Sequence, residues 1–315
     1  MKKRRAFFTP LRTVISVLLV IAAAGAALGL YLQGKSIPVL NPQGVVGKEE
    51  KNLILFTLML SVVVVVPVYI MLFVFAWRYR EGNPKKTKYT PDVEGNPWIE
   101  GLWWGIPITI IGILCIVTWV SAHQLDPYRP LASNVKPLKV QVVALPWKWL
   151  FIYPDYHIAS LNQLKIPAGV PVNFQITADA PMSAFWIPSL GTQVYAMPGM
   201  TSQLSLMADN AGEYRGSNSN INGKGYADMN FDVEALPSEE SFYIWARTIV
   251  DSPNHFHLDD DEYAQLAKPG TLKDVAYYHL HDDNLYTMVM NKYMNGSMPV
   301  AMDMGGGNGK VGVNQ

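Results

Sequence analysis

The sequence predicts a two-helix transmembrane hairpin, then an all-β exported domain, then a C-terminal helical extension rich in aromatic residues. Three observations support this fold class. Three uncharged apolar blocks lie within the first 122 of the 315 residues. Short β-patterned runs then recur about every ten residues, separated by Gly, Pro, Asn and Asp. After residue 236 helix-start signals replace this alternation, and Phe, Tyr and Trp remain frequent.

Residues 1–34 have the pattern of an export signal. Basic residues precede an uncharged stretch from Thr13 to Leu32, and positive charge followed by apolar and small residues is typical of secretory signals. No Cys follows, which excludes a lipoprotein anchor. The stretch is long for a cleaved peptide, so two interpretations stay open: a signal peptide and a retained signal anchor.

The hairpin is expected over residues 35–123. Leu53–Trp77 and Leu102–Ala122 contain no charged residue, and each is long enough to cross about 30 Å of hydrocarbon as a helix. The segment between them, 78–97, carries five basic and three acidic residues. The excess of Lys and Arg places this segment in the cytoplasm. Everything after His123 is then outside.

Charge and cysteine content exclude several classes of function for the exported part. Residues 124–315 hold 12 basic and 19 acidic side chains, a net charge of −7, so nucleic acid is an improbable partner. The single cysteine, Cys115, lies in the third apolar block. The exported part therefore has neither a disulfide framework nor a thiolate metal site. It also shows no nucleophile elbow, phosphate loop or dinucleotide fingerprint.

The β-patterned runs predict an antiparallel sandwich or barrel within residues 124–236. Ser238 before two glutamates marks a helix start, and Asp259 with Glu262 has capping-box spacing before a second helix. A last helix is expected from about Asn284 to Met294. The extension covers 237–304, and the glycine-rich tail 305–315 is expected to be disordered.

An aromatic cluster occupies Pro146–Pro154, whose sequence is PWKWLFIYP. Trp147, Trp149 and Phe151 alternate, so they share one face of a strand. Aromatic residues in strands more often belong to a core than to a contact surface. Both interpretations remain, with the core favoured by the residues alone.

Two minor patterns could bind metal. His255 with His257, and His279 with His281, form two His-x-His pairs, a common and unspecific spacing. Thioethers, which can hold Cu(I), are concentrated in the tail at Met288, Met290, Met294, Met298, Met302 and Met304. Met-rich helices more often only pack. A membrane-tethered copper-handling or binding protein is therefore the alternative function.

Glu100 stands at the cytoplasmic start of the third apolar block. An acid there complements the helix dipole, or it accepts protons at the mouth of a conduit. The residues alone do not decide between these two roles.

The segment 216–229, GSNSNINGKGYADM, is a turn-rich loop at a place where small β-domains often hold a metal, yet it contains no Cys or His. Its glycines, Gly216, Gly223 and Gly225, are expected to preserve turns, and its Asn side chains to hydrogen-bond the backbone.

Several motifs together resemble subunit II of the haem–copper oxidases. They are the segment AFWIPSLGTQVYAMPGM at Ala184–Met200, the E-x-x-W-W-x-x-P pattern from Glu100 to Pro107, and the aromatic strand PWKWLFIYP. The resemblance covers about residues 40 to 300. It implies a cupredoxin-like exported domain.

Copper-bearing members of that family hold a dicopper centre with two Cys, two His and a Met. Aligned on Met229, the resemblance implies that these positions are degenerate here: Ser183 and Tyr226 for the two His, Asn218 and Asn222 for the two Cys, and Asn220 for a ligating carbonyl. A dicopper centre needs bridging thiolates, whereas amides and hydroxyls are poor copper ligands. No metal is expected in this chain, and no electrons from cytochrome c.

The copper-free branch is subunit II of the bo-type ubiquinol oxidases, and Phe242–Gly270 resembles its aromatic-rich extension. The resemblance implies that the haems and copper reside in subunit I, which oxidises ubiquinol and reduces oxygen. Expected partners are subunits I, III and IV, membrane lipid and ubiquinol. The expected location is the bacterial inner membrane, multi-pass, with a periplasmic C-terminal domain. The resemblance also implies that Glu100 matches a proton-entry residue. It implies an aromatic interface formed by Trp147, Trp149 and Phe151.

Overall fold

The computed structural model describes residues 37–79, 95–252, 256–271, 274–280 and 284–294, with residues 23, 25 and 27. Nearly all of the expected export signal, most of the cytoplasmic segment and the glycine-rich tail therefore lie outside the described residues. The chain divides into two compact units. One contains Leu53–Val117, and the other combines Asn41–Asn52 with the chain from Thr118 onward.

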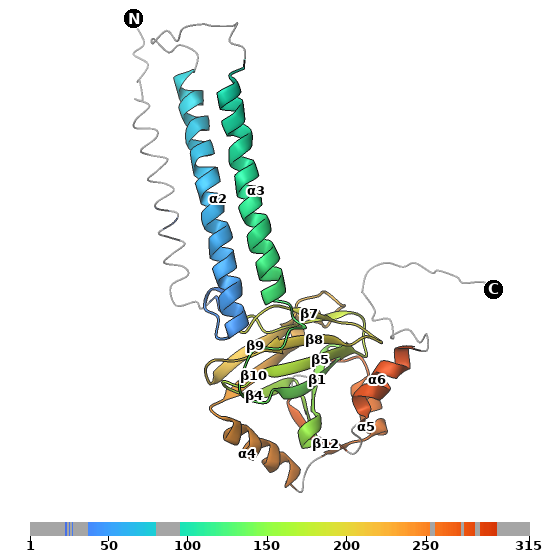
Figure 1. The fold of residues 1–315 in the computed structure, drawn as a ribbon. Coiled ribbons are helices and arrows are strands. Elements are labelled where there is room, and N and C mark those ends of the chain that lie inside the picture. Colours follow the sequence, from blue (N-terminus) through green and yellow to red (C-terminus); the bar gives the residue numbers. More distant parts are fainter. Residues whose placement is uncertain are drawn as a thin grey trace, which may run out of the picture. The chain divides into compact units, whose positions relative to one another are not determined.

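Two long helices contain the predicted spans. Helix α2 runs from Val45 to Arg78 and helix α3 from Pro97 to Gln124 (Figure 1). Both are long and apolar enough to cross a membrane, with mean hydropathies of 2.8 and 2.1 over their most apolar windows. Each helix extends beyond its uncharged stretch, because polar residues continue the helix at the ends. A short 3-10 helix, η1 (Pro38–Leu40), precedes α2.

The β-domain consists of two sheets. The seven-stranded sheet has the order β11-β12-β3-β2-β1-β5-β8, and the five-stranded sheet the order β4-β10-β9-β6-β7. The strands that the resemblance assigned to the cupredoxin-like domain are β1 (Leu138–Leu145), β2 (Lys148–Tyr153), β3 (Ile158–Leu161), β4 (Gln163–Pro167), β5 (Val172–Ala178), β6 (Ser183–Trp186), β7 (Val194–Ala196), β8 (Ser202–Leu206), β9 (Gly212–Asn218) and β10 (Asn230–Leu236). The all-β, cupredoxin-like class is confirmed.

The expectation of purely antiparallel pairing is wrong. β1 pairs with β5 in parallel, and β4 pairs with β10 in parallel. Alternation of apolar residues reveals strands but not their partners. β1 already pairs antiparallel with β2 through the turn at Pro146–Trp147, so its other edge is open to a strand arriving from further along the chain.

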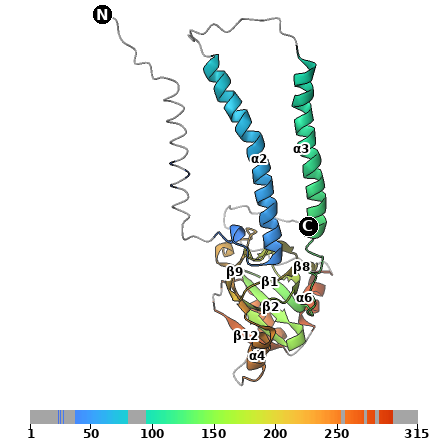
Figure 2. The ribbon, with the colours of Figure 1, turned by 60° about the vertical axis from the view of Figure 1, so that its left-hand side comes forward.

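The C-terminal extension is not only helical. Its helices are α4 (Glu239–Val250), α5 (Asp260–Leu266) and α6 (Leu285–Met294). It also adds β11 (Phe256–Leu258) and β12 (Ala276–Leu280), and β12 pairs antiparallel with β3. The extension thereby continues the seven-stranded sheet, and α4 lies beside β12 (Figures 1 and 2).

Both expected helix caps are confirmed. The Ser238 hydroxyl accepts a hydrogen bond from the N–H of Ser241 at 3.1 Å. Asp259 Oδ1 accepts from the N–H of Glu262 at 2.8 Å. Each cap satisfies a backbone donor that the first helical turn leaves without an intrahelical partner.

Strand β2 separates two hydrophobic cores. Trp149 and Phe151 face the core between the two sheets, whereas Leu150 and Ile152 face a second core that the extension completes. The side chains of a strand alternate between its faces. The extension therefore covers an apolar face that the β-domain would otherwise expose.

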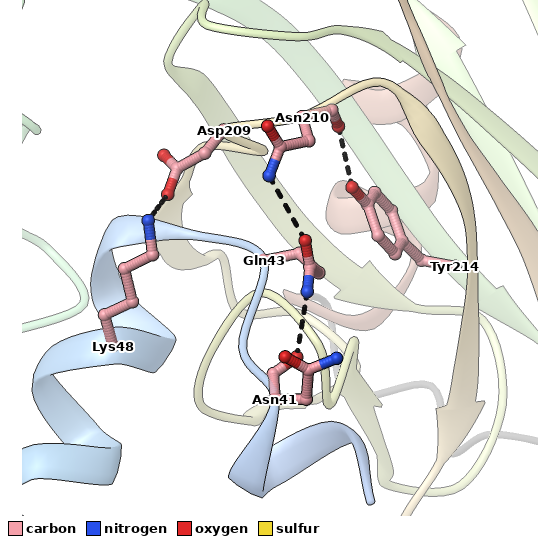
Figure 3. A network of polar contacts seen from close by, with 6 residues as sticks. All are labelled: Asn41, Gln43, Lys48, Asp209, Asn210 and Tyr214. Atoms are coloured by element: carbon pink, nitrogen blue, oxygen red, sulfur yellow. Dashed lines mark hydrogen bonds and ion pairs between the residues drawn. The ribbon is translucent and has the colours of Figure 1, made fainter. Parts of the chain in front are cut away.

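The start of α2 belongs to the β-domain unit (Figure 3). Lys48 Nζ forms an ion pair with Asp209 Oδ2 at 2.5 Å, and the Asn210 side chain donates to Gln43 Oε1 at 3.2 Å. The Tyr214 hydroxyl donates to the carbonyl of Asn210 at 2.7 Å. Backbone bonds add to this, since the N–H of Asp209 donates to the carbonyl of Gln43 at 2.8 Å.

One buried carboxylate joins the extension to the β-domain. Asp179 follows β5, and its side chain is 1% exposed. Tyr263 on α5 donates to Asp179 Oδ2 at 2.8 Å, Lys292 on α6 pairs with Oδ1 at 2.7 Å, and Tyr293 also donates to Oδ1. Burial is the larger cause that raises the pKa of Tyr263, and the neighbouring Asp179 charge is the second. The Tyr263 hydroxyl therefore keeps its proton and remains a donor.

We expect Asp179→Ala to lower the free energy of unfolding by about 2–4 kcal/mol, because it leaves the buried Tyr263 hydroxyl without its acceptor. Urea unfolding of the purified chain, followed by tryptophan fluorescence, measures the loss. The matched control is Asp251→Ala, which removes an exposed carboxylate 3.7 Å from Arg247 and should cost less than about 0.5 kcal/mol. Equal losses for the two variants would contradict the role of Asp179.

Candidate functional site

The loop between β9 and β10 brings the expected dicopper positions together. Gly216–Asn218 complete β9, and a short 3-10 helix, η3 (Tyr226–Asp228), precedes β10. Ser183 begins the neighbouring strand β6. Ser183, Asn218, Asn222 and Met229 are all buried, with exposed fractions of 0, 4, 3 and 1%. Strands and loop therefore place four of the six expected dicopper positions, three degenerate residues and Met229, inside the domain.

Asn218 links three segments through its side chain. Its Oδ1 accepts hydrogen bonds from the N–H of Ala184 at 2.8 Å and from the N–H of Asn220 at 3.0 Å. Its Nδ2 donates to Met229 Sδ at 3.3 Å. One amide thus satisfies two backbone donors, on β6 and in the loop, and contacts the thioether that precedes β10.

Asn222 makes the second set of contacts. Its Nδ2 donates to Ser183 Oγ at 2.9 Å and lies 3.5 Å from Met229 Sδ. Ser183 Oγ in turn donates to the carbonyl of Pro181 at 3.2 Å. Asn222 Oδ1 is buried and accepts no hydrogen bond from the residues that the structure describes. The amide is therefore held by its nitrogen.

The other two degenerate positions are peripheral. Asn220 Nδ2 donates to the carbonyl of Met182 at 2.8 Å at the surface. Tyr226 is half-buried and shapes the turn through its backbone: its N–H donates to Gly223 O at 3.2 Å, and its carbonyl accepts from Met229 N at 3.1 Å. Neither side chain joins the buried cluster of Ser183, Asn218, Asn222 and Met229.

These residues do not fit a dicopper centre. Both Asn side chains direct amide N–H groups at Met229 Sδ, so they use the sulfur lone pairs that a metal would need. The cluster provides neither a thiolate nor an imidazole, the ligands that hold copper in such sites. Across the described ranges, no group of three or more His, Cys, Asp or Glu side chains could hold a metal ion.

Two of the three loop glycines are required by neighbouring rings and not by turns. A Cβ at Gly216 would lie 2.0 Å from the Phe231 ring, and one at Gly225 would lie 2.4 Å from the Trp147 ring. Only Gly223 has a backbone that favours glycine, with φ of 125°. The expectation of three turn glycines is therefore corrected for Gly216 and Gly225.

The structure agrees with the core interpretation of the aromatic strand, which the residues alone favoured over a contact surface. Trp149 and Phe151 are fully buried, where they contact Phe185 and Phe231 with ring centroids 5.1–6.3 Å apart. They form the core and provide no contact surface. Trp147 lies in the β1–β2 turn with φ of 61°, so it is not a strand residue, and it packs half-buried against the same core.

The remaining candidates lie apart from this cluster. Glu100 is exposed in the first turn of α3, in the other unit. His257 and His279 are opposite each other on β11 and β12, with ring centroids 5.7 Å apart. His255, His281, Met298, Met302 and Met304 lie outside the described residues. Met288 and Met294 are exposed, whereas Met290 Sδ accepts from the Thr201 hydroxyl at 2.5 Å.

Sequence reasoning missed Asp179, on which the attachment of the extension depends. Its only sequence signal is an acid at the end of a buried strand, in the run ITADA. Its partners come from segments 84 to 114 residues away, and no local pattern indicates such contacts.

Comparison with known proteins identifies two family domains. Cytochrome C oxidase subunit II, periplasmic domain, matches residues 156–236, and COX Aromatic Rich Motif matches residues 255–297. The cytochrome bo(3) ubiquinol oxidase subunit 2 of Pseudomonas putida is 47% identical over 272 residues, which cover 86% of this chain and 85% of the relative. Ubiquinol oxidase subunit 2 of Acetobacter aceti is 40% identical, over 86% of this chain and 88% of the relative.

We expect Asn218→Ala to destabilise the β-domain by about 2–3 kcal/mol, because the buried N–H of Ala184 loses its acceptor. Asn220→Ala is the matched control. It removes one side-chain hydrogen bond at the surface and should cost less than about 1 kcal/mol. Urea unfolding of the purified chain measures both, and an equal cost would show that the Asn218 amide does not join the strands.

Gly216→Ala should destabilise the domain by about 2 kcal/mol, because the added methyl overlaps the buried Phe231 ring. Gly270→Ala is the control, since a Cβ there meets nothing within 4 Å. The midpoint of thermal unfolding compares the variants. An unchanged midpoint for Gly216→Ala would mean that the ring has room to move.

Proposed function

This chain belongs to the subunit 2 family of the ubiquinol oxidases, and we propose that it is subunit II of a proton-pumping complex that oxidises ubiquinol and reduces oxygen to water. The observation that carries the proposal is the buried cluster of Ser183, Asn218, Asn222 and Met229. It occupies the expected dicopper positions with neutral side chains that bond to one another.

The cluster bears on whether this chain accepts electrons. A dicopper centre accepts electrons because thiolates bridge its metals, and amide groups supply no such bridge. We therefore assign no redox cofactor to this chain. The haems and copper of the complex belong to subunit I, where ubiquinol delivers electrons from within the membrane. Cytochrome c is therefore not proposed as an electron donor to this chain.

The two apolar helices support an inner-membrane location. We propose that α2 and α3 form a multi-pass hairpin with the β-domain in the periplasm, exported by the signal in residues 1–34. The exposed apolar faces of both helices then contact lipid and the other membrane subunits. Partners are subunits I, III and IV, with subunit I as the main contact.

Purification of the assembled complex tests this function. We expect oxygen consumption with ubiquinol and none above background with reduced cytochrome c. Metal analysis should give copper in the amount that subunit I alone accounts for. Rapid oxidation of cytochrome c, or extra copper that remains with this chain after the subunits are separated, would overturn the proposal and favour copper binding by the His and Met residues.

Glu100 is proposed to collect protons at the cytoplasmic side. It is exposed in the first turn of α3, and Asn96 precedes that turn with its Oδ1 accepting from the N–H of Trp98 at 3.0 Å. The Asn96 side chain thus already caps the start of α3, so the Glu100 carboxylate is not needed as a cap. An acid at a membrane helix end is a suitable proton acceptor for a neighbouring conduit.

We expect Glu100→Gln to slow turnover several-fold while the complex still assembles, because the amide cannot carry a proton. Oxygen consumption of the purified complex measures turnover, and gel analysis of its subunits measures assembly. Glu240→Gln, at an exposed acid on α4, is the control and should leave turnover unchanged. Full turnover of an assembled Glu100→Gln complex would remove this role from Glu100.

A further inference from the structure

A pocket lies in the β-domain unit where α3 ends. Its volume is about 320 Å³, within the range of roughly 300–1,000 Å³ typical of ligand sites. Its wall combines the start of α2, the chain that follows α3, and β8. The lining residues are Val46, Glu49, Gln124, Leu125, Asp126, Arg129 and Leu131, with Pro127, Pro130, Ala132, Thr192, Leu204 and Ser205.

The pocket wall is firmly held. The N–H of Gly47 donates to the carbonyl of Leu190 at 3.0 Å, and a Cβ at Gly191 would lie 2.9 Å from Val46 Cγ1. The ion pair between Lys48 and Asp209 fixes the same helical turn (Figure 3). The pocket is therefore part of the folded domain and does not depend on a ligand to form.

Chain continuity places the pocket at the membrane surface. The uncharged stretch of α3 ends at Ala122, and Leu125 and Arg129 follow within seven residues. Trp119 is 70% exposed, and its ring contacts that of His123 in a tilted arrangement, with centroids 4.6 Å apart and planes at 40°. Exposed Trp residues at the end of a membrane helix lie at the level of the lipid headgroups.

The charges at the pocket suit a headgroup with both signs. Arg129 is directed toward the helix end, since its Nη1 donates to the carbonyl of His123 at 3.3 Å. Within the described part of the chain, no carboxylate forms an ion pair with Arg129, and neither Glu49 nor Asp126 pairs with a cation. A guanidinium binds phosphate through paired N–H donors, and the two carboxylates can accept from an ammonium group.

We propose that this pocket binds the headgroup of phosphatidylethanolamine from the outer leaflet of the inner membrane. The phosphate contacts Arg129, the ammonium group lies against Glu49 and Asp126, and the acyl chains run along Trp119. The ammonium group donates hydrogen bonds to carboxylates, which a quaternary choline cannot do. The inference rests on the proposed membrane hairpin, but it does not depend on the electron donor.

Native mass spectrometry of the assembled oxidase tests the site. The complex is stripped of lipid and titrated with phosphatidylethanolamine in detergent. We expect Arg129→Gln to lose one bound lipid, or to bind it about tenfold more weakly, because the phosphate loses a charge-assisted contact. Arg215→Gln, an exposed arginine on β9 outside the pocket, should match the wild type. Identical lipid binding by wild type and Arg129→Gln would overturn the inference.

Two further measurements identify the occupant. Phosphatidylglycerol should bind more weakly than phosphatidylethanolamine, and free phosphoethanolamine should not compete at equal concentration, since it lacks acyl chains. A photo-cross-linking residue at Leu131 should yield a phosphatidylethanolamine adduct. A cross-link to another oxidase subunit instead would overturn the inference. If the complex is active but binds no phosphatidylethanolamine in the pocket, the proposed function stands and only the lipid site is wrong.

Discussion

The candidate site depends on the requirement that buried polar groups find hydrogen-bond partners. Asn218 meets this requirement for the N–H groups of Ala184 and Asn220, and with Asn222 it contacts Met229 Sδ. The neutral amides thus join β6, the loop and the start of β10.

Apolar packing and one buried polar contact together attach the extension to the β-domain. Strand β2 contributes one face to the core between the sheets and the other to a second core beneath α5 and α6. Asp179 then provides the specific polar contact, because its buried carboxylate bonds to both helices. Apolar burial supplies most of the stabilisation of such contacts. The extension is thus an integral part of the domain.

Much of the fold was predictable because its signals are local. The uncharged stretches at 53–77 and 102–122 gave both helices, and the caps at Ser238 and Asp259 were visible as sequence patterns. Pairing was not predictable, since the parallel β1–β5 ladder and the contribution of β12 to the sheet depend on distant segments. The convergence of Ser183, Asn218 and Asn222 came from the family resemblance. Burial of Trp149 agrees with the core interpretation that the alternating aromatic residues already favoured, whereas the close approach of Phe231 to Gly216 depends on strand packing that no local pattern indicates.

We propose that hydrogen bonds, and not a metal, hold the loop between β9 and β10. Amide hydrogen exchange of the assembled complex, recorded with added copper and after chelation, tests this proposal. The N–H groups of Ala184 and Asn220 should be protected to the same degree in both conditions, because the Asn218 side chain is their acceptor. Protection that disappears on chelation would show instead that a metal orders the loop.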